Sequence, residues 1–255
     1  MSYPGGKAGD GVYQRLISLM PPHDVYIEPF VGGGALLCRK RPARLNIGVD
    51  LDAEVIRQWQ ARTARASDTA GGIATHDKAK FTFHVGDGLA FLQSYPFTGR
   101  ELVYCDPPYV LRTRTSRQYR YEMTDAQHAA LLAILTTLPC AVMLSGYWTA
   151  MYAEALDGWT TITYEAMTRG GRVATEWLWM NYPRPLHLHD YRYLGEGFRE
   201  RERIRRKKQR WVNRLQTMPH LERQALLSAV AEAFPSPAAL ASHGEGDNPS
   251  SPRQP

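Results

Sequence analysis

Apolar residues along this chain follow two spacings that alternate with each other. Short apolar runs that end at a glycine, a proline or an acidic residue are typical of buried strands. Between these runs, apolar residues recur every three or four positions, which predicts amphipathic helices. Strands are predicted at 25–27, 45–49, 81–85, 102–105 and 140–144. Helices are predicted over 8–20, from Ala35, after Asp50 through Trp59, from Thr124 through Leu138 and over 148–156, with a loop at 66–80.

Two further strands are predicted at 160–164 and 173–182. Residues 169–172, Arg-Gly-Gly-Arg, are typical of a hairpin turn in which glycine supplies positive φ. Strands that alternate with helices indicate a parallel sheet, and a terminal hairpin adds antiparallel strands at its edge. The predicted fold class is therefore α/β, with a mostly parallel seven-stranded sheet and an antiparallel edge hairpin. Pro183 and Pro185 predict that this domain spans residues 1–185.

A basic helical extension is predicted at 186–234, after a polar connector that includes His187, His189 and Tyr191. Its helices are expected at 200–215 and 221–234, and the Ser-, Pro- and Gly-rich residues 235–255 predict disorder. The formal net charge is +6, yet residues 199–214 alone hold nine Lys or Arg and two Glu. The basic character is therefore local and favours a polyanion as partner. The densest basic run is Arg205, Arg206, Lys207 and Lys208.

Composition excludes several classes of protein. No run approaches the roughly 18 apolar residues that cross a bilayer. The first residues lack the apolar stretch of a signal peptide. Cys38, Cys105 and Cys140 are scattered and form no CxxC pair, which argues against a disulfide framework and a zinc site. With a hydrophobic content of 44%, we expect a globular cytoplasmic protein without metal or membrane contact. A monomer is one possibility, and the sequence does not determine the oligomeric state.

Acidic residues follow four of the predicted strands, namely Glu28, Asp50, Asp87 and Asp106. The carboxyl ends of parallel strands meet at one edge of a sheet, where ligands bind in open α/β folds. Asp106 is followed by Pro107, Pro108 and Tyr109. Two consecutive prolines fix φ and stiffen the backbone directly after the carboxylate. A carboxylate, a rigid carbonyl and an aromatic ring are therefore expected together at this edge; a simple Pro-Pro turn is the alternative.

A glycine loop, Glu28-Pro29-Phe30-Val31-Gly32-Gly33-Gly34, connects the first predicted strand to its helix. A strand, a glycine loop and a helix form the first unit of a nucleotide-binding α/β sheet. Asp50 follows Gly34 by 16 residues, a position suited to ribose hydroxyls. Alternatively, Asp50 caps the next helix, or Asp52 does so. Gly5-Gly6-Lys7 lacks the Gx4GK[ST] spacing, which excludes a P-loop nucleoside triphosphatase.

Arginines and tyrosines are interleaved in residues 110–123, directly after Tyr109. The segment is too polar for the core, and its composition suits contacts with a nucleic-acid backbone and stacking on bases. A solvated loop is the alternative. The candidate nucleic-acid contacts are Arg112, Arg114, Arg117, Tyr119 and Arg120, together with Arg169 and Arg172 of the hairpin turn.

In their order along the chain, these motifs resemble those of the Dam-like DNA adenine methyltransferases. The matching stretches are Tyr3-Pro4-Gly5-Gly6-Lys7, residues 28–34, Val49-Asp50, Asp106-Pro107-Pro108-Tyr109 and residues 175–182. The resemblance covers residues 1 to about 183 and implies a Rossmann-like class I methyltransferase fold with S-adenosylmethionine as cofactor. The cofactor contacts that it implies are Tyr3 and Lys7 near the methionine end, Glu28, Phe30, Gly32 and Gly34 in the loop, Asp50 at the ribose, Asp87 at the adenine, and Asp106.

The implied reaction explains the residue types after the fourth strand. The exocyclic amine of adenine is conjugated with its ring and is a poor nucleophile. Asp106 and the Pro107 carbonyl can accept its two N–H bonds and so localise the lone pair, each bond being worth roughly 1.5–3 kcal/mol. Tyr109 is expected to stack on the target base, which must leave the duplex to be reached.

One departure from the family concerns DNA recognition. Dam-like enzymes carry a recognition domain before this motif, whereas 55 residues separate Asp50 from Asp106 here. We therefore expect relaxed specificity and mostly phosphate contacts, as in compact phage-encoded members. An RNA adenine methyltransferase and an idle DNA-binding protein of the same fold remain alternatives. A cytosine-amine enzyme is disfavoured, because those more often have Ser in place of Asp106.

Overall fold

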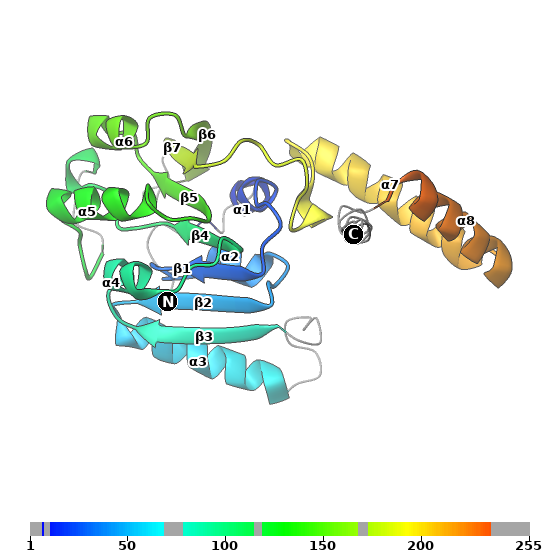
Figure 1. Cartoon of the computed structure of the whole chain (residues 1–255), viewed down its shortest axis with the longest axis horizontal. Coiled ribbons are helices and arrows are strands. Elements are labelled where there is room, and N and C mark those ends of the chain that lie inside the picture. Colours follow the sequence, from blue (N-terminus) through cyan, green and yellow to red (C-terminus); the bar gives the residue numbers. More distant parts are fainter. Residues whose placement is uncertain (1–6, 8–10, 69–78, 115–118, 168–172, 236–255) are drawn as a thin grey trace, which may run out of the picture. The chain divides into compact units, whose positions relative to one another are not determined.

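The computed structural model of the chain is built around the sheet that the apolar runs predict (Figure 1). The structure describes residues 7, 11–68, 79–114, 119–167 and 173–235. Its strands are β1 (Val25–Glu28), β2 (Leu45–Asp50), β3 (Lys80–Val85), β4 (Glu101–Cys105), β5 (Ala141–Gly146), β6 (Thr160–Met167) and β7 (Val173–Met180). They lie in the order β3-β2-β1-β4-β5-β7-β6, and β7 runs antiparallel to both of its neighbours. Within the described residues, the predicted fold class is therefore confirmed.

Helices cover both faces of the sheet, and successive residues of a strand alternate between two apolar cores. On β4, Leu102 and Tyr104 pack into one core, whereas Val103 and Cys105 pack into the other. The first core is completed by α1 (Val12–Ile17), α2 (Ala35–Arg39) and α3 (Ala53–Asp68). The second is completed by α4 (Gly88–Ser94), α5 (Asp125–Leu135) and α6 (Ala150–Ala155). Burial on both faces explains why the central strands are continuous apolar runs in the sequence.

Several helix boundaries differ from the prediction; α1 ends at Ile17 rather than at residue 20, and α5 ends at Leu135 rather than at Leu138. Helix α1 begins at Val12 rather than at residue 8, because Gly11 adopts a φ of 91° at its N-cap. Residues 8–10 lie outside the described part of the chain. Helix α3 continues to Asp68, so the predicted loop at 66–80 begins too early. Helix propensity therefore persists further into this polar stretch than its Ser and Thr content indicated.

Side-chain caps determine where two helices of the second layer begin. Thr124 accepts a hydrogen bond from the Gln127 amide, and the Gln127 side chain accepts one from the Thr124 amide at 2.9 Å. This capping box starts α5 where the sequence predicts it. Helix α4 has no counterpart in the prediction. It begins because Asp87 accepts the Leu89 amide at 2.7 Å, which is an N-cap interaction.

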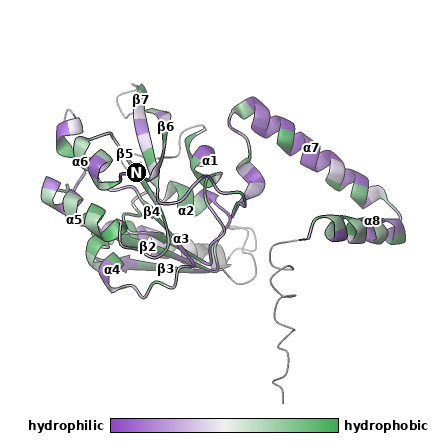
Figure 2. Cartoon of the chain, turned by 45° about the horizontal axis from the view of Figure 1, so that its top comes forward, coloured by the Kyte–Doolittle hydropathy of each residue, from purple (hydrophilic) through white to green (hydrophobic). Residues whose placement is uncertain are grey.

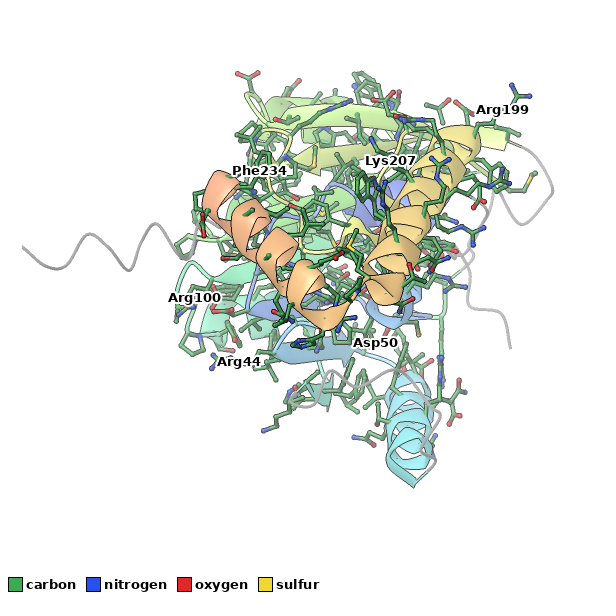
Figure 3. The ribbon with its side chains drawn as sticks, turned by 90° about the vertical axis from the view of Figure 1, so that its right-hand side faces the viewer. Arg44, Asp50, Arg100, Arg199, Lys207 and Phe234 are labelled. Atoms are coloured by element: carbon green, nitrogen blue, oxygen red, sulfur yellow. The ribbon has the colours of Figure 1, made fainter. Side chains whose placement is uncertain are left out.

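The chain divides into two compact units, Met1–Arg201 and Glu202–Pro255. The two helices expected in the extension are present as α7 (Phe198–Thr217) and α8 (His220–Ala233), and neither contains a buried residue. Figure 2 shows that α7 is predominantly hydrophilic. Figure 3 shows Arg199 and Lys207 along α7 and Phe234 at the end of α8. In the described ranges, no helix is both long enough and apolar enough to cross a membrane.

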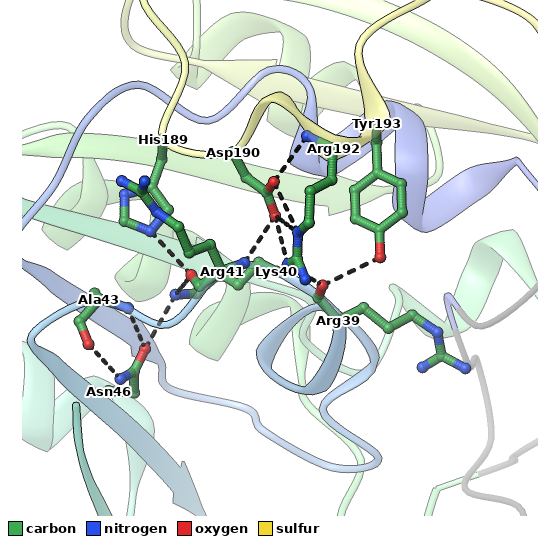
Figure 4. Close-up of polar contacts among 9 residues, drawn as sticks. All are labelled: Arg39, Lys40, Arg41, Ala43, Asn46, His189, Asp190, Arg192 and Tyr193. Atoms are coloured by element: carbon green, nitrogen blue, oxygen red, sulfur yellow. Dashed lines mark hydrogen bonds and ion pairs between the residues drawn. The ribbon is translucent and has the colours of Figure 1, made fainter. Parts of the chain in front are cut away.

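The segment after Pro185 packs against the end of α2 (Figure 4). Asp190 is 2% exposed and accepts the Arg41 amide at 2.8 Å and the Arg192 guanidinium at 2.7 Å. Arg192 also donates to the Arg39 carbonyl at 2.8 Å, one of the carbonyls that a helix C-terminus leaves without a partner. His189 Nε2 lies 2.9 Å from the Arg41 carbonyl oxygen. This stretch, which includes η2 (Tyr191–Tyr193), is therefore a packed part of the first unit rather than the simple connector that the sequence indicated.

Replacing Asp190 by alanine should destabilise the first unit. The Arg41 amide and the Arg192 guanidinium would lose their buried acceptor, which costs about 1–3 kcal/mol of unfolding free energy. Burial alone would raise the pKa of Asp190, but the hydrogen bonds from Arg192 and Arg41 lower it overall. Its contribution is therefore present at neutral pH and is lost as the pH falls through that lowered pKa. Urea unfolding at several pH values measures both effects.

Glu196→Gln is the matched control, because Glu196 is exposed and lies 3.5 Å from an exposed Arg184. An exposed pair of this kind contributes about 0–1 kcal/mol. Equal unfolding midpoints for Asp190→Ala and the unsubstituted chain would contradict the assigned role of Asp190.

Candidate functional site

The carboxyl ends of β1 and β4 form the centre of the candidate site. These two strands pair in parallel, with Ile27 opposite Val103. From β1 the chain continues to β2 on one side, whereas β4 is followed by β5 on the other. Such a change of direction opens a crevice at the carboxyl edge of an open parallel sheet, where ligands bind. Glu28 at the end of β1 and Asp106 directly after β4 therefore lie at the same carboxyl edge of the sheet.

The glycine loop after β1 is held between Asp50 and Trp59. The Gly32 amide donates to Asp50 Oδ2 at 2.9 Å, and the Gly32 carbonyl accepts the Trp59 indole N–H at 2.9 Å. Gly34 has a φ of 53°, and a Cβ added there would lie 2.3 Å from the Trp59 ring. Glycine is therefore required at Gly34 for both conformation and space.

Asp50 organises two backbone segments at the end of β2. Besides the Gly32 amide, its carboxylate accepts the Asp52 amide at 2.8 Å. Asp52 in turn accepts the Glu54 amide at 3.0 Å, so Asp52 caps α3 while Asp50 braces the glycine loop. Burial raises the pKa of Asp50. Each carboxylate oxygen can accept a second hydrogen bond, so Asp50 retains acceptor capacity for a ligand.

The turn after β3 packs against the glycine loop. A Cβ added at Gly88 would lie 2.3 Å from the carbonyl oxygen of Pro29, so only glycine fits at this contact. Asp87, immediately before it, is the N-cap of α4 and is exposed. The loops after β1, β2 and β3 are thus in direct contact at one edge.

Glu28 lies beneath the glycine loop in a buried environment. Its carboxyl accepts the Tyr26 hydroxyl at 2.7 Å and the Leu37 amide at 3.0 Å. Burial raises the pKa of Glu28 to about 8, so the group is largely protonated at neutral pH. Lys40 lies 4.0 Å from the Tyr26 ring centroid, and burial lowers its pKa to about 7. Phe30, next in the loop, is half-buried against the second core.

A buried cluster of charged and phenolic groups adjoins Asp106. Lys7 is 3% exposed; its ammonium donates to the Tyr109 hydroxyl and to Glu176, and lies 3.2 Å from Asp106 Oδ1. The Tyr109 hydroxyl donates to Glu176 Oε2 at 2.8 Å, and the Tyr164 hydroxyl donates to the same oxygen at 2.9 Å. Residues from four separate segments of the chain therefore share one hydrogen-bonded cluster.

The charges in this cluster are mutually dependent. Burial alone would lower the pKa of Lys7, but Asp106, Tyr164 and Glu176 raise it well above its ordinary value. Burial raises the pKa of Asp106 to about 6, although the Lys7 ammonium opposes that shift. Lys7 is therefore charged at neutral pH, and Asp106 is mostly ionised there but loses its charge in mild acid.

Glu176 and Tyr164 were not predicted as site residues. On β7, Glu176 occupies the same face as Leu178 and Met180, both of which are buried. An acidic residue at an inward position of a strand must find a buried partner. That alternation is the sequence signal that could have identified Glu176. The position of its partner, Lys7, could not be read from the same pattern.

Tyr109 lies within the cluster rather than at its surface. Tyr109 is 5% exposed; its ring forms a T-shaped pair with Tyr147, with 4.8 Å between ring centroids, and the Lys7 ammonium lies over the ring at 4.9 Å from its centroid. In this arrangement the face of Tyr109 is covered by protein. The expected stacking on a target base therefore requires Tyr109 or its neighbours to move.

The basic loop after β4 contains arginines in two different environments, and it includes η1 (Leu111–Thr113). The Arg114 side chain is 4% exposed, pairs with Glu122 at 2.5 Å and donates to the Tyr109 carbonyl at 2.8 Å. Arg114 therefore braces the motif backbone in this structure instead of facing solvent. Arg112 and Arg120 are exposed and form longer ion pairs, with Asp125 at 3.4 Å and Asp52 at 3.3 Å. Tyr119 is half-buried. Four candidate residues, Tyr3, Arg117, Arg169 and Arg172, lie outside the described residues.

Metal ligation has no candidate cluster in the part of the chain that the structure describes. No group of three or more His, Cys, Asp or Glu side chains there is arranged to hold an ion. The described arrangement instead offers a glycine loop, carboxylates at successive strand ends, and a buried Lys–Asp–Glu cluster. This arrangement can bind a ligand at the carboxyl edge of the sheet, where carboxylate oxygens would accept hydrogen bonds from the ligand.

Several solved structures are similar to part of this chain. Magnesium protoporphyrin IX methyltransferase from Synechocystis, with bound S-adenosylmethionine, is 15% identical over 67% of this chain and 75% of its own, with a TM-score of 0.40. A dimethyladenosine transferase from Plasmodium falciparum is 12% identical over 66% and 59%, with a TM-score of 0.39. Precorrin 8W decarboxylase from Methanobacterium thermoautotrophicum is 13% identical over 70% and 91%, with a TM-score of 0.42. No protein-family model and no curated protein sequence matches this chain. At these identities and TM-scores, the likeness carries no conclusion about the family or activity of this chain.

Replacing Gly88 by alanine should disturb the contact between the loops after β1 and β3. The added methyl group would meet the backbone oxygen of Pro29, which cannot rotate away. Overpacking of this kind costs about 1–3 kcal/mol of unfolding free energy. Gly86→Ala is the matched control two residues earlier, because a Cβ there has nothing within 4 Å. Urea unfolding of both variants tests the contact, and equal stabilities would contradict it.

Proposed function

We propose that this chain is an S-adenosylmethionine-dependent methyltransferase that modifies the exocyclic amine of adenine in DNA. One observation carries the proposal: the glycine loop after β1 and the Asp106-Pro107-Pro108-Tyr109 motif after β4 lie at the same carboxyl edge of the sheet. Strands β1 and β4 are adjacent and parallel. Open α/β folds bind nucleotides at the carboxyl edge where the strand order reverses direction, as it does between these two strands. The proposal follows from the resemblance of the sequence motifs to those of Dam-like enzymes. We propose that the enzyme acts in the cytoplasm.

The residues at this edge suit the proposed cofactor. Gly32 and Gly34 let the backbone approach a ligand closely, and Asp50 retains acceptor capacity for ribose hydroxyls. Glu28 and Phe30 would border the loop, Asp87 would reach the adenine, and Lys7 with Tyr3 would lie near the methionine end. When bound, the cofactor supplies a methyl group that its sulfonium charge activates. The ionised Asp106 would complement that positive charge.

Asp106 would orient the target amine in this reaction. Its carboxylate and the Pro107 carbonyl would each accept one N–H bond and direct the nitrogen lone pair toward the methyl donor. Preorganised acceptors in a dry site act more strongly than the same groups in water. In the structure, Asp106 Oδ1 is instead 3.2 Å from the Lys7 ammonium. Binding of the target amine would therefore have to replace or share the Lys7 contact.

DNA contacts would come from exposed arginines near the crevice and from α7. Arg112 and Arg120 are exposed beside the site, and α7 carries Arg205, Arg206, Lys207 and Lys208 on an exposed helix. Arg117, Arg169 and Arg172 remain candidates from the sequence. Between Asp50 and Asp106, α3, β3 and α4 occupy most of the described residues. The proposed enzyme would therefore recognise few bases of its DNA substrate. In this proposal a catalytic domain carries out methyl transfer, and a basic helical extension contacts phosphates.

Nucleoside mass spectrometry tests this function. Adenine-unmethylated DNA would be incubated with the protein and S-adenosylmethionine, then digested to nucleosides. The expected product is 6-methyladenine, and its share of total adenine measures the specificity. Methylation of a matched RNA oligonucleotide but not of DNA would favour an RNA adenine methyltransferase. Absence of any methylated base would favour an idle binding protein of the same fold.

Asp106→Ala should abolish methyl transfer while retaining much of the cofactor affinity. Loss of a preorganised electrostatic contact at a reacting group typically lowers kcat about 10²–10³-fold. Because burial raises the pKa of Asp106 to about 6, the rate of the unsubstituted enzyme should fall as the pH drops through about 6, where the acceptor becomes protonated. Turnover as a function of pH and calorimetric cofactor binding measure these effects. Near-full turnover by Asp106→Ala would falsify the proposed mechanism.

The salt dependence of DNA binding tests the role of α7. Each phosphate contact contributes about −0.9 to the slope of log K against log salt. The double variant Lys207→Gln/Lys208→Gln should therefore flatten the slope. The control is Arg44→Gln/Arg100→Gln, because these residues directly precede β2 and β4 and so lie at the amino edge of the sheet. Equal slopes for the α7 variant and the unsubstituted chain would show that α7 does not contact phosphates.

A further inference from the structure

Glu176 is the convergence point of the buried cluster beside Asp106. Its Oε2 atom accepts hydrogen bonds from the Lys7 ammonium, the Tyr109 hydroxyl and the Tyr164 hydroxyl. These donors come from the N-terminal segment, the motif after β4, and β6. Glu176 itself lies on β7 and is 7% exposed. One carboxylate oxygen thus ties three segments of the chain to the candidate site.

Glu176 and Asp106 share a single described ammonium partner. Lys7 bridges the two carboxylates, with Asp106 at 3.2 Å and Glu176 in the shorter contact. Behind Glu176, the Tyr164 hydroxyl also reaches Ser145 at 3.3 Å, which anchors the cluster to the core. A buried charge that loses its partner is strongly destabilised. Any group that displaces Lys7 from Asp106 therefore requires a second anion to keep the ammonium.

We propose that Glu176 is a positioning residue of the transfer site, which retains the Lys7 ammonium so that the target amine can take over the Asp106 carboxylate. This inference rests on the proposed function. Without the Glu176 charge, Asp106 would be the anion nearest to Lys7, and the two would pair more tightly. The target amine would then have to compete with a full ion pair for the same acceptor. Glu176 would also fix the Tyr109 hydroxyl, which holds the motif in register with β7.

The informative variant is Glu176→Gln, which keeps the size and an acceptor oxygen but removes the charge. The KM for DNA should rise about tenfold with a smaller change in kcat, because the added cost falls on binding of the target amine. Cofactor affinity should be unchanged. Combining Glu176→Gln with Lys7→Gln removes the competing ammonium, so Glu176→Gln should have little effect on KM in the Lys7→Gln background. Such non-additivity is expected for residues in one network.

A carboxyl titration tests the charge coupling without any turnover. The Asp106 carboxyl can be followed by carbon NMR in the full-length, ligand-free protein. Glu176→Gln should lower the Asp106 midpoint, because it removes a neighbouring negative charge and leaves Lys7 to Asp106. Lys7→Gln should raise it. Glu28 is also near Asp106, and burial raises its pKa to about 8. Burial also raises the pKa values of the nearby tyrosines, which therefore stay neutral in the titration range; these are Tyr26, Tyr104, Tyr109, Tyr119 and Tyr164.

Glu165→Gln is the matched control on the same hairpin. Glu165 is exposed on β6 and accepts the Thr175 hydroxyl at 2.9 Å, away from the cluster. It should leave the KM, the kcat and the Asp106 midpoint unchanged. A Glu176→Gln variant that only unfolds more easily, with KM and Asp106 midpoint unmoved in the folded protein, would overturn the proposal in favour of a purely structural role.

The two hypotheses fail in different ways. If the unsubstituted protein methylates neither DNA nor RNA, the proposed function fails and the positioning role fails with it. In that case the titration still shows whether Glu176 controls the charge of Asp106. If methylation occurs but Glu176→Gln changes neither KM nor the Asp106 midpoint, the function stands and the inference about Glu176 is wrong.

Discussion

The parallel pairing of β1 with β4 is the constraint on which the candidate site depends. The chain winds outward from these two strands in opposite directions, and the carboxyl edge at such a point is where ligands bind in open α/β sheets. The glycine loop and the Asp106 motif are far apart in the sequence, and this strand pairing brings them to the same edge of the sheet. Asp50 and Trp59 then hold the glycine loop against the neighbouring strand and helix.

The buried ammonium of Lys7 connects segments that are distant in the sequence at the carboxyl edge of the sheet. Removing an ammonium from water costs several kcal/mol unless opposite charges surround it. Lys7 meets that condition between Asp106 and Glu176, which brings the start of the chain and its last strand to the motif after β4. The antiparallel hairpin therefore does more than complete the sheet, because β7 supplies the second anion and β6 supplies Tyr164.

The sequence predicted the sheet well because the physical signal for a doubly buried strand is local. Each of β1, β2, β4 and β5 is mainly apolar and almost entirely buried, and the acids at the ends of β1, β2 and β4 mark the carboxyl edge. Helix α4 was missed because its signal is short, a single Asp87 cap before a few apolar residues. Glu176 was missed for another reason. Its inward position on β7 could be read from alternation, but the partner that makes a buried acid tolerable lies at Lys7, in a segment with no periodic pattern.

Arg114 and Arg120 show why residue type alone did not separate contacts with a ligand from contacts within the protein. Both arginines belong to the same basic loop, and a sequence reading assigned both to a nucleic-acid backbone. In the structure, Arg114 is buried against Glu122 and the Tyr109 carbonyl, whereas Arg120 is exposed. A guanidinium has several donors in a fixed plane, so it can satisfy a carboxylate and a backbone carbonyl at once. The loop that was expected to hold DNA therefore also stiffens the Asp106 motif, and a change in Arg114 would act on the motif geometry before it acted on any phosphate.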